Sequence, residues 1–494
     1  MQKFVNIIDT AVRKFWMLFC IVIFLLAIVI KALYSMYDYP YFSKNTWMDI
    51  LFLLFFIAGY ALLYCFSPKI EKKVKYWMLW LFFGIAGVIF VLLVPLKPFS
   101  DMKYVADGAL LFAKRDIDSI LTSDYLQHIT KNMKVSVFYS FFILFLPKTV
   151  LSLRLVNVLF YLLIAQFMSM TAKNLGFQCS KLVYIVTGSF LPLLLYCNHI
   201  YFDLPTLLMC TLALYFYTRG KNTKNMLCSA LCIGIGSCLR VLAFLVLIAI
   251  LIDYIFRYKK ALFEDKAKRL IVFLSMIIIA VGIPKACDKT LNMFFRAEGA
   301  QNESIWDLFW MGINEEEFGF MHNEIAGGGP KSFSDFYNLL VSRNVKQNCR
   351  LFGRKIFWEW SQGTYQAQRY AFGADAEYSP AGELSKFDYH SPVTGLLLND
   401  DQIARQLINS FCRSQYLALF LFMILGLFNL KCDEMDKYRV FIYLMFGTFL
   451  ILIFYELKSR YILHCIIPMM MLALRGLENT KKISRSVFKK SADS

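Results

Sequence analysis

The chain alternates long apolar runs with short charged connections. About twelve runs of roughly 16–23 residues carry few or no charged side chains, close to the length an α-helix needs to cross about 30 Å of hydrocarbon. A spanning segment must satisfy its backbone hydrogen bonds internally, which favours helices. The predicted spans cover approximately residues 15–35, 47–66, 76–95, 152–172, 182–197, 204–218, 225–240, 241–256, 270–284, 413–430, 438–455 and 461–476.

The charged connections indicate which ends of these spans face the cytoplasm. Lys and Arg are enriched in the cytoplasmic loops of membrane proteins, and here they gather in alternate connections. The basic segments are residues 1–14, 67–75, 173–181, 219–224, 257–269, 431–439 and 481–490. We therefore predict a multi-pass protein of the plasma membrane with both termini in the cytoplasm.

Two segments between the spans need a separate interpretation. Val135–Pro147 is apolar but short. We interpret it as a helix on the outer interface, because a crossing there would turn the later basic loops outward. Lys285–Cys412 is the longest polar segment and contains a Gly-Gly-Gly-Pro turn signal. It is too long for a simple loop and predicts a mixed, partly folded domain outside the membrane.

The same pattern divides the chain into four regions. Residues 1–75 are predicted to be an N-terminal transmembrane hairpin with a cytoplasmic loop. Residues 76–284 are predicted to be a transmembrane core whose first outer loop covers 96–151. The remaining regions are an extracytoplasmic loop domain, 285–412, and C-terminal spans with a basic cytoplasmic tail, 413–494. The predicted fold class is an all-α polytopic membrane protein.

Composition supports a membrane protein and narrows its partners. Of the 494 residues, 58% are hydrophobic and 18% are charged, and the mean hydropathy of +0.52 is too high for a soluble domain. The net charge of +18 comes largely from the basic connections, so it indicates membrane lipids rather than nucleic acid as a partner. The thirteen cysteines show no Cys-x-x-Cys or Cys/His metal spacing.

Polar side chains gather at the outer ends of the predicted spans, where charge is costly unless it faces water, a substrate or a partner. Structural alternatives exist, because Asp101 and Asp203 could cap helices and the arginines could extend toward the interface. Lys and Arg are normally enriched on the cytoplasmic side, however, so basic residues at the outer ends of spans are unexpected. We therefore expect them to have an anionic partner. The group comprises Asp101, Asp107, Arg154, Asn198, His199, Tyr201, Asp203, Arg240, Glu456, Lys458, Arg460 and Tyr461.

Four motifs in this group resemble those of the GT-C glycosyltransferases, multispan enzymes that take sugars from polyprenyl-linked donors. The similarity is to the protein O-mannosyltransferase and lipid A aminoarabinose transferase types, including Gram-positive members. Pro98-Phe99-Ser100-Asp101 opens the first large outer loop, where the family keeps its acidic catalytic residue. The other three motifs are Leu151-Ser152-Leu153-Arg154-Leu155-Val156-Asn157, Tyr201-Phe202-Asp203-Leu204-Pro205, and Glu456–Tyr461 followed by Pro468.

The resemblance implies a GT-C fold with juxtamembrane helices on the outer face. It also implies transfer of a hexose or pentose from a polyprenyl-phosphate donor to an envelope glycan, lipid or protein acceptor. The sequence departs from the family pattern in two ways. The acidic loop follows the third predicted span, so residues 1–66 would be an added hairpin. Asp101 and Asp107 are not adjacent, so no metal or other cofactor is indicated.

The chemistry of such a transfer assigns a role to each candidate. The acceptor hydroxyl needs a base, and the departing phosphate needs cations. We assign Asp101 as the base and Asp203 as a second catalytic carboxylate that orients the acceptor or a cation. The predicted phosphate ligands are Arg240, Lys458 and Arg460, and the supporting candidates are Asp107, Arg154, Tyr201, Glu456 and Tyr461. A single displacement would invert the anomeric centre.

Two other functions remain alternatives. An O-antigen polymerase or ligase also has about a dozen spans and a large late outer loop, and it relies on Arg and His in that loop. Residues that keep this alternative open are His322, Arg343, Arg350, Arg354, Arg369 and His390. A transporter or flippase ranks lower, because the sequence has no internal repeat and its notable charges lie at span ends rather than at the midplane.

Overall fold

Helices make up most of the chain that the structure describes. The computed structural model describes residues 2–29, 46–220, 222–258, 266–295, 305–314, 332–373, 387–389, 391–397, 402–431 and 434–492. Within these ranges no strand forms, and an isolated antiparallel bridge joins Leu96 to Phe387.

The longer helices follow the predicted spans. In chain order they are α1 (Gln2–Val29), α2 (Thr46–Lys73), α3 (Tyr76–Leu93), α8 (Val150–Asn174), α9 (Ser180–Gly188), α10 (Leu191–Leu195), α11 (Asp203–Arg219), α12 (Thr223–Leu239), α13 (Phe244–Tyr258), α14 (Lys266–Phe295), α20 (Ile403–Phe428), α21 (Met435–Leu452) and α22 (Ile466–Ala492).

Shorter helices lie between them. They are α4 (Ser100–Lys114), α5 (Ile117–Leu121), α6 (Asp124–His128), α7 (Thr130–Phe142), α15 (Ile305–Ile313), α16 (Phe333–Ser342), α17 (Val345–Ser361), α18 (Ala367–Phe372) and α19 (Pro392–Gly395), with 3₁₀ turns η2 (Tyr196–Asn198), η3 (Val241–Ala243) and η8 (Ser459–Cys465).

Seven helices within the described ranges are long and apolar enough to cross a membrane, or eight if the bent pair α9 and α10 forms one broken span. The pair bends by 56°. Helices α11, α12 and α13 have 17, 17 and 15 residues, and α21 carries three charged residues in its first two turns. The structure thus confirms an all-α chain with several helices able to span a membrane, and it has a helix at each predicted span.

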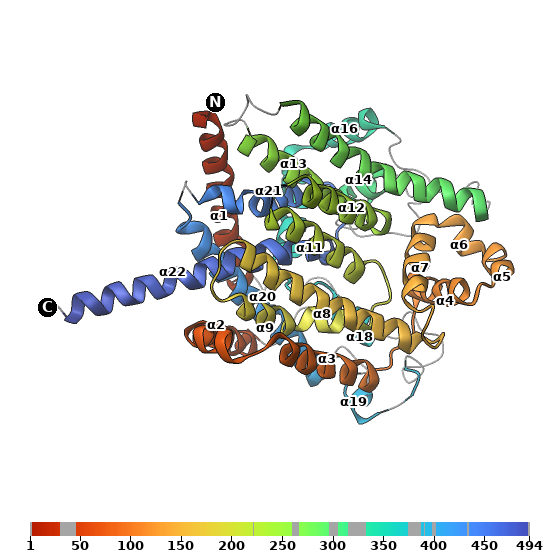
Figure 1. The fold of residues 1–494 in the computed structure, drawn as a ribbon, viewed down its shortest axis with the longest axis horizontal. Coiled ribbons are helices and arrows are strands. Elements are labelled where there is room, and N and C mark those ends of the chain that lie inside the picture. Colours follow the sequence, from red (N-terminus) through yellow and green to blue (C-terminus); the bar gives the residue numbers. More distant parts are fainter. Residues whose placement is uncertain are drawn as a thin grey trace.

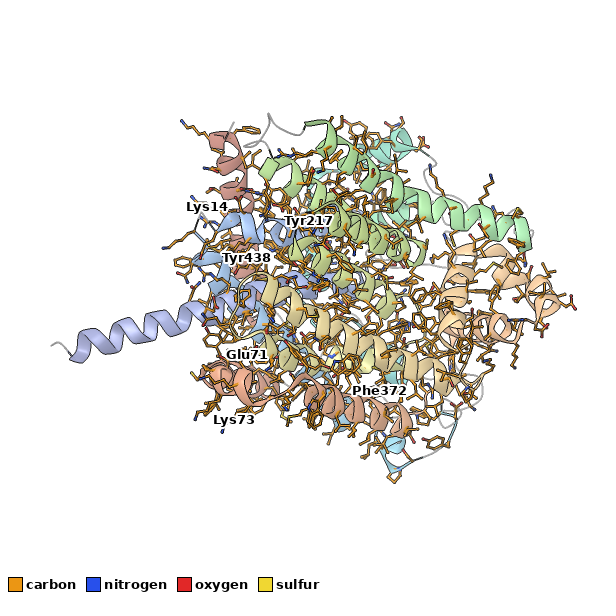
Figure 2. The ribbon with its side chains drawn as sticks, in the orientation of Figure 1. Lys14, Glu71, Lys73, Tyr217, Phe372 and Tyr438 are labelled. Carbon is orange, nitrogen blue, oxygen red and sulfur yellow. The ribbon has the colours of Figure 1, made fainter. Side chains whose placement is uncertain are left out.

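Helix α7 covers most of the apolar segment 135–147. It has 13 residues, about 20 Å at 1.5 Å per residue, which is shorter than the hydrocarbon core of a bilayer. It packs against α4, and α4–α7 lie together at one end of the bundle, while α22 projects from the opposite end (Figure 1). Lys14, Glu71, Lys73 and Tyr438, which lie in or beside predicted cytoplasmic segments, are located toward the α22 end (Figure 2).

Close helix packing explains two glycines in the C-terminal helices. A Cβ atom on Gly426 would collide with the Leu472 carbonyl, and one on Gly476 would collide with the Phe422 carbonyl. Helices in lipid associate mainly through van der Waals contact, so small residues at the crossing allow the backbones to approach. This crossing makes α20 and α22 the most extensively packed helix pair in the described chain.

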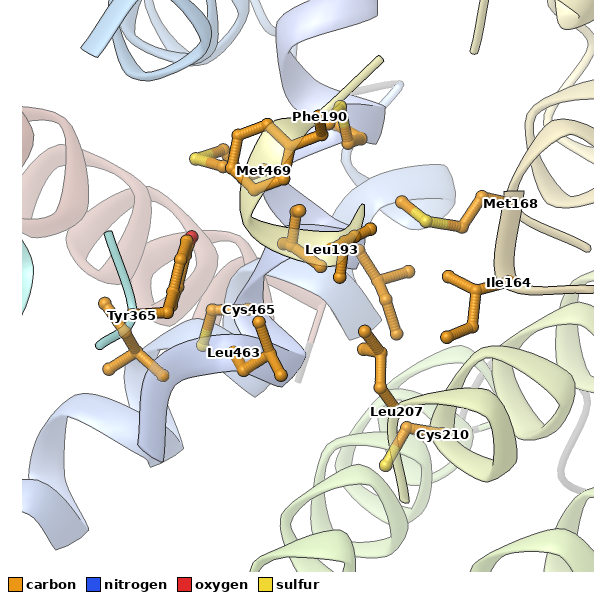
Figure 3. Close-up of a cluster of buried hydrophobic side chains, with 14 of the residues drawn as sticks. Ile164, Met168, Phe190, Leu193, Leu207, Cys210, Tyr365, Leu463, Cys465 and Met469 are labelled. Carbon is orange, nitrogen blue, oxygen red and sulfur yellow. The ribbon is translucent and has the colours of Figure 1, made fainter. Parts of the chain in front are cut away.

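Helices from different predicted regions pack against one another. Helices α1 and α2 each pack against α20, which joins the predicted N-terminal hairpin to the C-terminal helices. The described part of the predicted loop domain contributes Phe357, Trp360 and Tyr365 to the core of the bundle. Trp360 meets Trp16 of α1 with ring centroids 5.1 Å apart. Figure 3 shows Tyr365 among the buried side chains of this core.

A cluster of mostly buried charges lies at the C-terminal end of α11. We call it the Arg439 cluster. The Arg439 guanidinium donates to Asp9 through Nε at 3.1 Å, to Asp253 through Nη1 at 3.1 Å and to Asp436 through Nη2 at 2.6 Å. Asp253 also accepts from Arg257 Nε at 2.6 Å and from the Tyr217 hydroxyl. The cluster connects α1, α11, α13 and α21.

Candidate active site

Asp101 lies in the first turn of α4, and its side chain is exposed. Phe99 occupies the N-cap position and no side chain caps the helix, so the structure does not support the helix-cap alternative for Asp101. Ser100 has a φ of 49°, in the left-handed region that residues other than glycine rarely adopt. Such strain persists where surrounding contacts fix the backbone, and it often marks functional sites.

Two tyrosines and an asparagine surround the Asp101 carboxylate. The Tyr125 hydroxyl donates to Oδ1 at 2.5 Å, and the Tyr201 hydroxyl lies 3.2 Å from Oδ2. Asn132 joins the two phenols, because its Nδ2 donates to Tyr125 at 2.7 Å and its Oδ1 lies 3.0 Å from the Tyr201 hydroxyl. Burial raises the pKa of Tyr201 well above its usual value, so the phenol stays protonated and donates.

Asp203 lies two residues beyond Tyr201, in the first turn of α11, and is only 2% exposed. Phe202 is the N-cap residue of α11, and the Asp203 side chain makes no capping hydrogen bond. Its Oδ1 accepts from Arg240 Nη1 at 2.9 Å, and its Oδ2 lies 3.8 Å from Arg460 Nη1 and 3.3 Å from His199 Nδ1. We call these four residues the Asp203 cluster.

The Asp203 cluster carries more positive than negative charge. Burial and the two guanidinium groups hold the pKa of His199 well below its usual value, so the imidazole is neutral. Two arginines therefore share one carboxylate among the described residues. Within that part of the chain, Arg240 Nη2 and Arg460 Nε have no hydrogen-bond acceptor. Asp203 Oδ2 and His199 Nδ1 also lack hydrogen-bond partners there, so the cluster holds unused donors and an unused acceptor, and the two arginine donors are available to an anion.

Aromatic rings hold the two guanidinium groups in place. Arg240 lies 4.3 Å from the ring centroid of Tyr461 and 4.9 Å from that of Phe202. Arg460 lies 5.2 Å from the ring of Tyr370 and 5.6 Å from that of Tyr201. Cation–π contacts of this kind stabilise the charge without consuming the N–H donors that an anion would need.

A small cavity of about 10 Å³, room for about one water molecule, adjoins the Asp203 cluster. Asp203, Thr206, Arg240 and His464 supply its polar lining, and Leu207, Cys210 and Leu463 contribute to its apolar wall. Figure 3 shows these three apolar residues among the buried hydrophobic side chains.

Glu456 and Lys458 form a second pair next to Tyr461. Glu456 Oε1 lies 2.5 Å from Lys458 Nζ, and Oε2 accepts from the Tyr461 hydroxyl. Burial opposes ionisation of Glu456, but Lys458 and Tyr461 outweigh it and lower the pKa of the carboxyl. Lys458 is thus already neutralised, which makes it a weaker phosphate ligand than the two arginines.

A buried lysine continues this network into α17. Lys355 Nζ donates to the carbonyls of Gly312 at 2.5 Å, Ile453 at 3.0 Å and Tyr455 at 2.7 Å. Burial lowers the pKa of Lys355 to about 8, against the opposing effect of Glu359 and Glu456. Burial also raises the pKa of the neighbouring Glu359 well above its usual value. Lys355 therefore adds to this network a positive charge that the neighbouring carboxyl groups neutralise poorly.

The structure brings most of the predicted site residues together. Asp101, Tyr201, Asp203, Arg240, Arg460, Tyr461, Glu456 and Lys458 form one connected set of contacts. Arg154 lies apart from these contacts, where it donates to the Leu96 carbonyl and lies 3.4 Å from Asp388. Asp107 is exposed further along α4 and is not part of the Asp101 hydrogen bonds.

Several residues of this network were not predicted as site residues. Tyr125 and Asn132 lie in the short helices α6 and α7, and Tyr370, Lys355 and Glu359 lie in the predicted loop domain. A signal was present for Lys355 and Glu359, which are four residues apart in an otherwise apolar, Trp-containing turn. Tyr125, Asn132 and Tyr370 have no such signal, because tertiary packing alone places them.

The structure describes only some of the residues behind the polymerase alternative. Arg343 donates to the Ile313 carbonyl, and His322 and His390 lie outside the described residues. In the part of the chain that the structure describes, no three His, Cys, Asp or Glu side chains are grouped to bind a metal ion. Comparisons with protein-family models, with curated proteins and with solved structures found no match.

Proposed function

We propose that this chain is a membrane glycosyltransferase of GT-C architecture. In this proposal twelve helices span the plasma membrane, both termini are cytoplasmic and the site opens outward. A polyprenyl-phosphate-linked hexose or pentose is the donor, and an envelope glycan, lipid or protein hydroxyl is the acceptor. The observation that carries the proposal is that Tyr201 joins an exposed carboxylate, Asp101, to Arg460, one of two arginines whose charge a single carboxylate offsets.

The reaction follows from the positions of these groups. Asp101 accepts the proton of the acceptor hydroxyl as its oxygen attacks the anomeric carbon. The bond from that carbon to the phosphate oxygen breaks, and the electron pair leaves with the polyprenyl phosphate. Arg240 and Arg460 bind the phosphate through guanidinium N–H groups, which suit its geometry. One displacement inverts the anomeric centre, and no metal is required.

The supporting residues receive narrower roles. Asp203 positions the two arginines, since it contacts both and is too buried to reach an acceptor. Tyr125 and Tyr201 orient the Asp101 carboxylate through their hydroxyls. Glu456 accepts a hydrogen bond from the Tyr461 hydroxyl and so positions the Tyr461 ring. Arg240 lies against that ring.

Replacing Asp101 by Asn tests the proposal. Purified protein would be given polyprenyl-phosphate sugars, a labelled hexose and a labelled pentose, with membrane extract as the acceptor source. We expect Asp101→Asn to lower release of polyprenyl phosphate by at least about 10²-fold, because loss of a general base typically costs 10²–10⁴ in rate. The unfolding temperature should stay close to that of the wild type, since the residue is exposed.

Asp107→Asn is the matched control, because it removes the same charge from an exposed position on the same helix. It should transfer sugar at the wild-type rate. Equal activity of Asp101→Asn and the wild type would remove Asp101 from the base role. No transfer by the wild type from either donor class would reject the proposed reaction itself.

A further inference from the structure

Two cysteines from different helices face each other beside the candidate site. Cys238 lies in the last turn of α12 and Cys287 lies in the outer half of α14. Their thiols are within hydrogen-bonding reach of each other, and both side chains are partly exposed. Neither belongs to the network around Asp101 and Asp203.

The packing of α12 on α14 explains why these two residues meet. Gly234 approaches α14 so closely that a Cβ there would lie 2.7 Å from the Ile283 side chain. Cys238 follows Gly234 by one helical turn, and Cys287 follows Ile283 by one turn. Because residues four apart share a helix face, the two cysteines are opposite each other in parallel helices. The close approach of the two helices at Gly234 and Ile283 therefore favours a contact between the two cysteines one turn further on.

An ion pair lies beside the two thiols. Asp288, next to Cys287, binds Lys134 of α7 at 2.7 Å, which brings both an ammonium group and a carboxylate close to the thiols. The ammonium favours the thiolate, the form that attacks a disulfide, while the carboxylate and partial burial oppose it. Cys287 also borders the small apolar cluster that joins α14 to the short helices α5–α7.

We propose that Cys238 and Cys287 form a reversible disulfide by exchange with a small or protein disulfide. One thiolate attacks the external disulfide and releases one thiolate from it. The second cysteine thiolate then attacks the mixed disulfide and releases the other. The external disulfide gains two electrons and the two protons lost by the cysteines. The product links the ends of α12 and α14 two residues before Arg240, and it does not depend on the proposed glycosyl transfer.

Peptide mapping of the full-length protein in membranes tests this proposal. The membranes would be treated with oxidised glutathione, blocked with an alkylating reagent and digested with trypsin. We expect peptides 225–240 and 286–289 to be joined, and dithiothreitol to separate them. The linked protein should also unfold at a temperature several degrees higher than the reduced protein, because the cross-link restricts the unfolded chain.

Substitutions identify the cysteine involved, since peptide 225–240 also contains Cys228 and Cys232. Cys238→Ser should abolish the link, and Cys228→Ser on the same helix should preserve it. The exposed Cys349 shows when the reagent is effective, because it should become glutathionylated. The proposal is overturned if Cys349 is modified while Cys238 and Cys287 remain alkylatable, or if each carries glutathione without a link.

Discussion

Two buried clusters of charge lie at opposite ends of α11, a helix of 17 residues and about 25 Å, and they are built in opposite proportions. The Arg439 cluster pairs Arg439 and Arg257 with three carboxylates, of which Asp436 is exposed, and Arg439 Nε, Nη1 and Nη2 each have an acceptor. The Asp203 cluster places one carboxylate between two guanidinium groups and leaves donors without acceptors in the described chain.

The difference separates a structural cluster from a binding site. Once buried charges are fully paired, removing one partner leaves the others uncompensated, which is strongly destabilising. A cluster with excess positive charge and unused N–H groups can instead accept an anion. The Arg439 cluster therefore has the features of a structural contact between helices. The Asp203 cluster has the features of an anion-binding site. Four substitutions or conditions can test this contrast.

Arg439→Met should have the largest effect on stability. It would leave Asp9 buried without its cation and Asp253 with Arg257 alone, so we expect a loss of about 3–5 kcal/mol in the free energy of unfolding. Thermal or denaturant unfolding in detergent would measure it. Lys437→Met removes a charge from an exposed position on the same helix and should change stability by less than about 0.5 kcal/mol. Similar losses in both variants would contradict the structural role.

Alkaline pH should stabilise the region around Lys355. Its pKa falls from 10.5 to about 8 on folding, so between these values the unfolded chain binds more protons and the free energy of unfolding rises with pH. Below pH 8 the cost of burying the ammonium is fully present. The group should contribute about 3 kcal/mol across this range.

The measurement is the difference in stability between wild type and Lys355→Met at several pH values, which cancels other titrating groups. That difference should change across the range from about pH 8 to 10.5. A constant difference would show that Lys355 keeps an ordinary pKa.

Asp203→Asn should destabilise the protein by about 2 kcal/mol, less than Arg439→Met, because the aromatic rings still hold both guanidinium groups. Inorganic pyrophosphate should recover part of this loss, since an anion can replace the missing charge. The matched control is Arg439→Met, which should gain no such recovery. Equal recovery in both variants, or none in Asp203→Asn, would contradict the idea that the Asp203 cluster accepts anions.

Tyr201→Phe should have the smallest effect on stability, about 1 kcal/mol, because it removes one hydroxyl while the ring beside Arg460 remains. Sugar transfer should fall by about tenfold through kcat, since Asp101 loses one of its two tyrosine donors. Steady-state kinetics would show this. Tyr104→Phe is the control: its ring stacks on Tyr125 at 3.9 Å and its hydroxyl does not contact Asp101. Equal kinetics in the two variants would remove the Tyr201 hydroxyl from the site.

Hydropathy and charge predicted the helical layout well but its packing poorly. Helices occur at every predicted span, because apolar length is a local property of the sequence. The 56° bend between α9 and α10 and the packing of Trp360 against Trp16 depend on neighbours far along the chain. Burial of α17 could not be predicted from hydropathy, since Lys355 and Glu359 look like surface residues until the carbonyls around them are known.

The candidate site shows the same division. Placing span ends on one face was enough to group Asp101, Asp203, Arg240 and Arg460, and the structure does bring them close together. The separate role of each of these residues could not be predicted from the sequence. Lys458 is paired with Glu456, and Asp203 is too buried for the acceptor role that the sequence had left open. Those facts depend on distances of a few ångströms.

The five residues from His199 to Asp203 give the site a further property. Tyr201 meets Asp101 through its hydroxyl and Arg460 through its ring, while Asp203 holds both arginines. A ligand that draws Arg460 toward itself must therefore alter the support of Asp101. By thermodynamic reciprocity, whatever binds beside Asp101 changes affinity at the arginines by the same factor. Donor and acceptor would then bind cooperatively, with one short stretch of backbone as the coupling element.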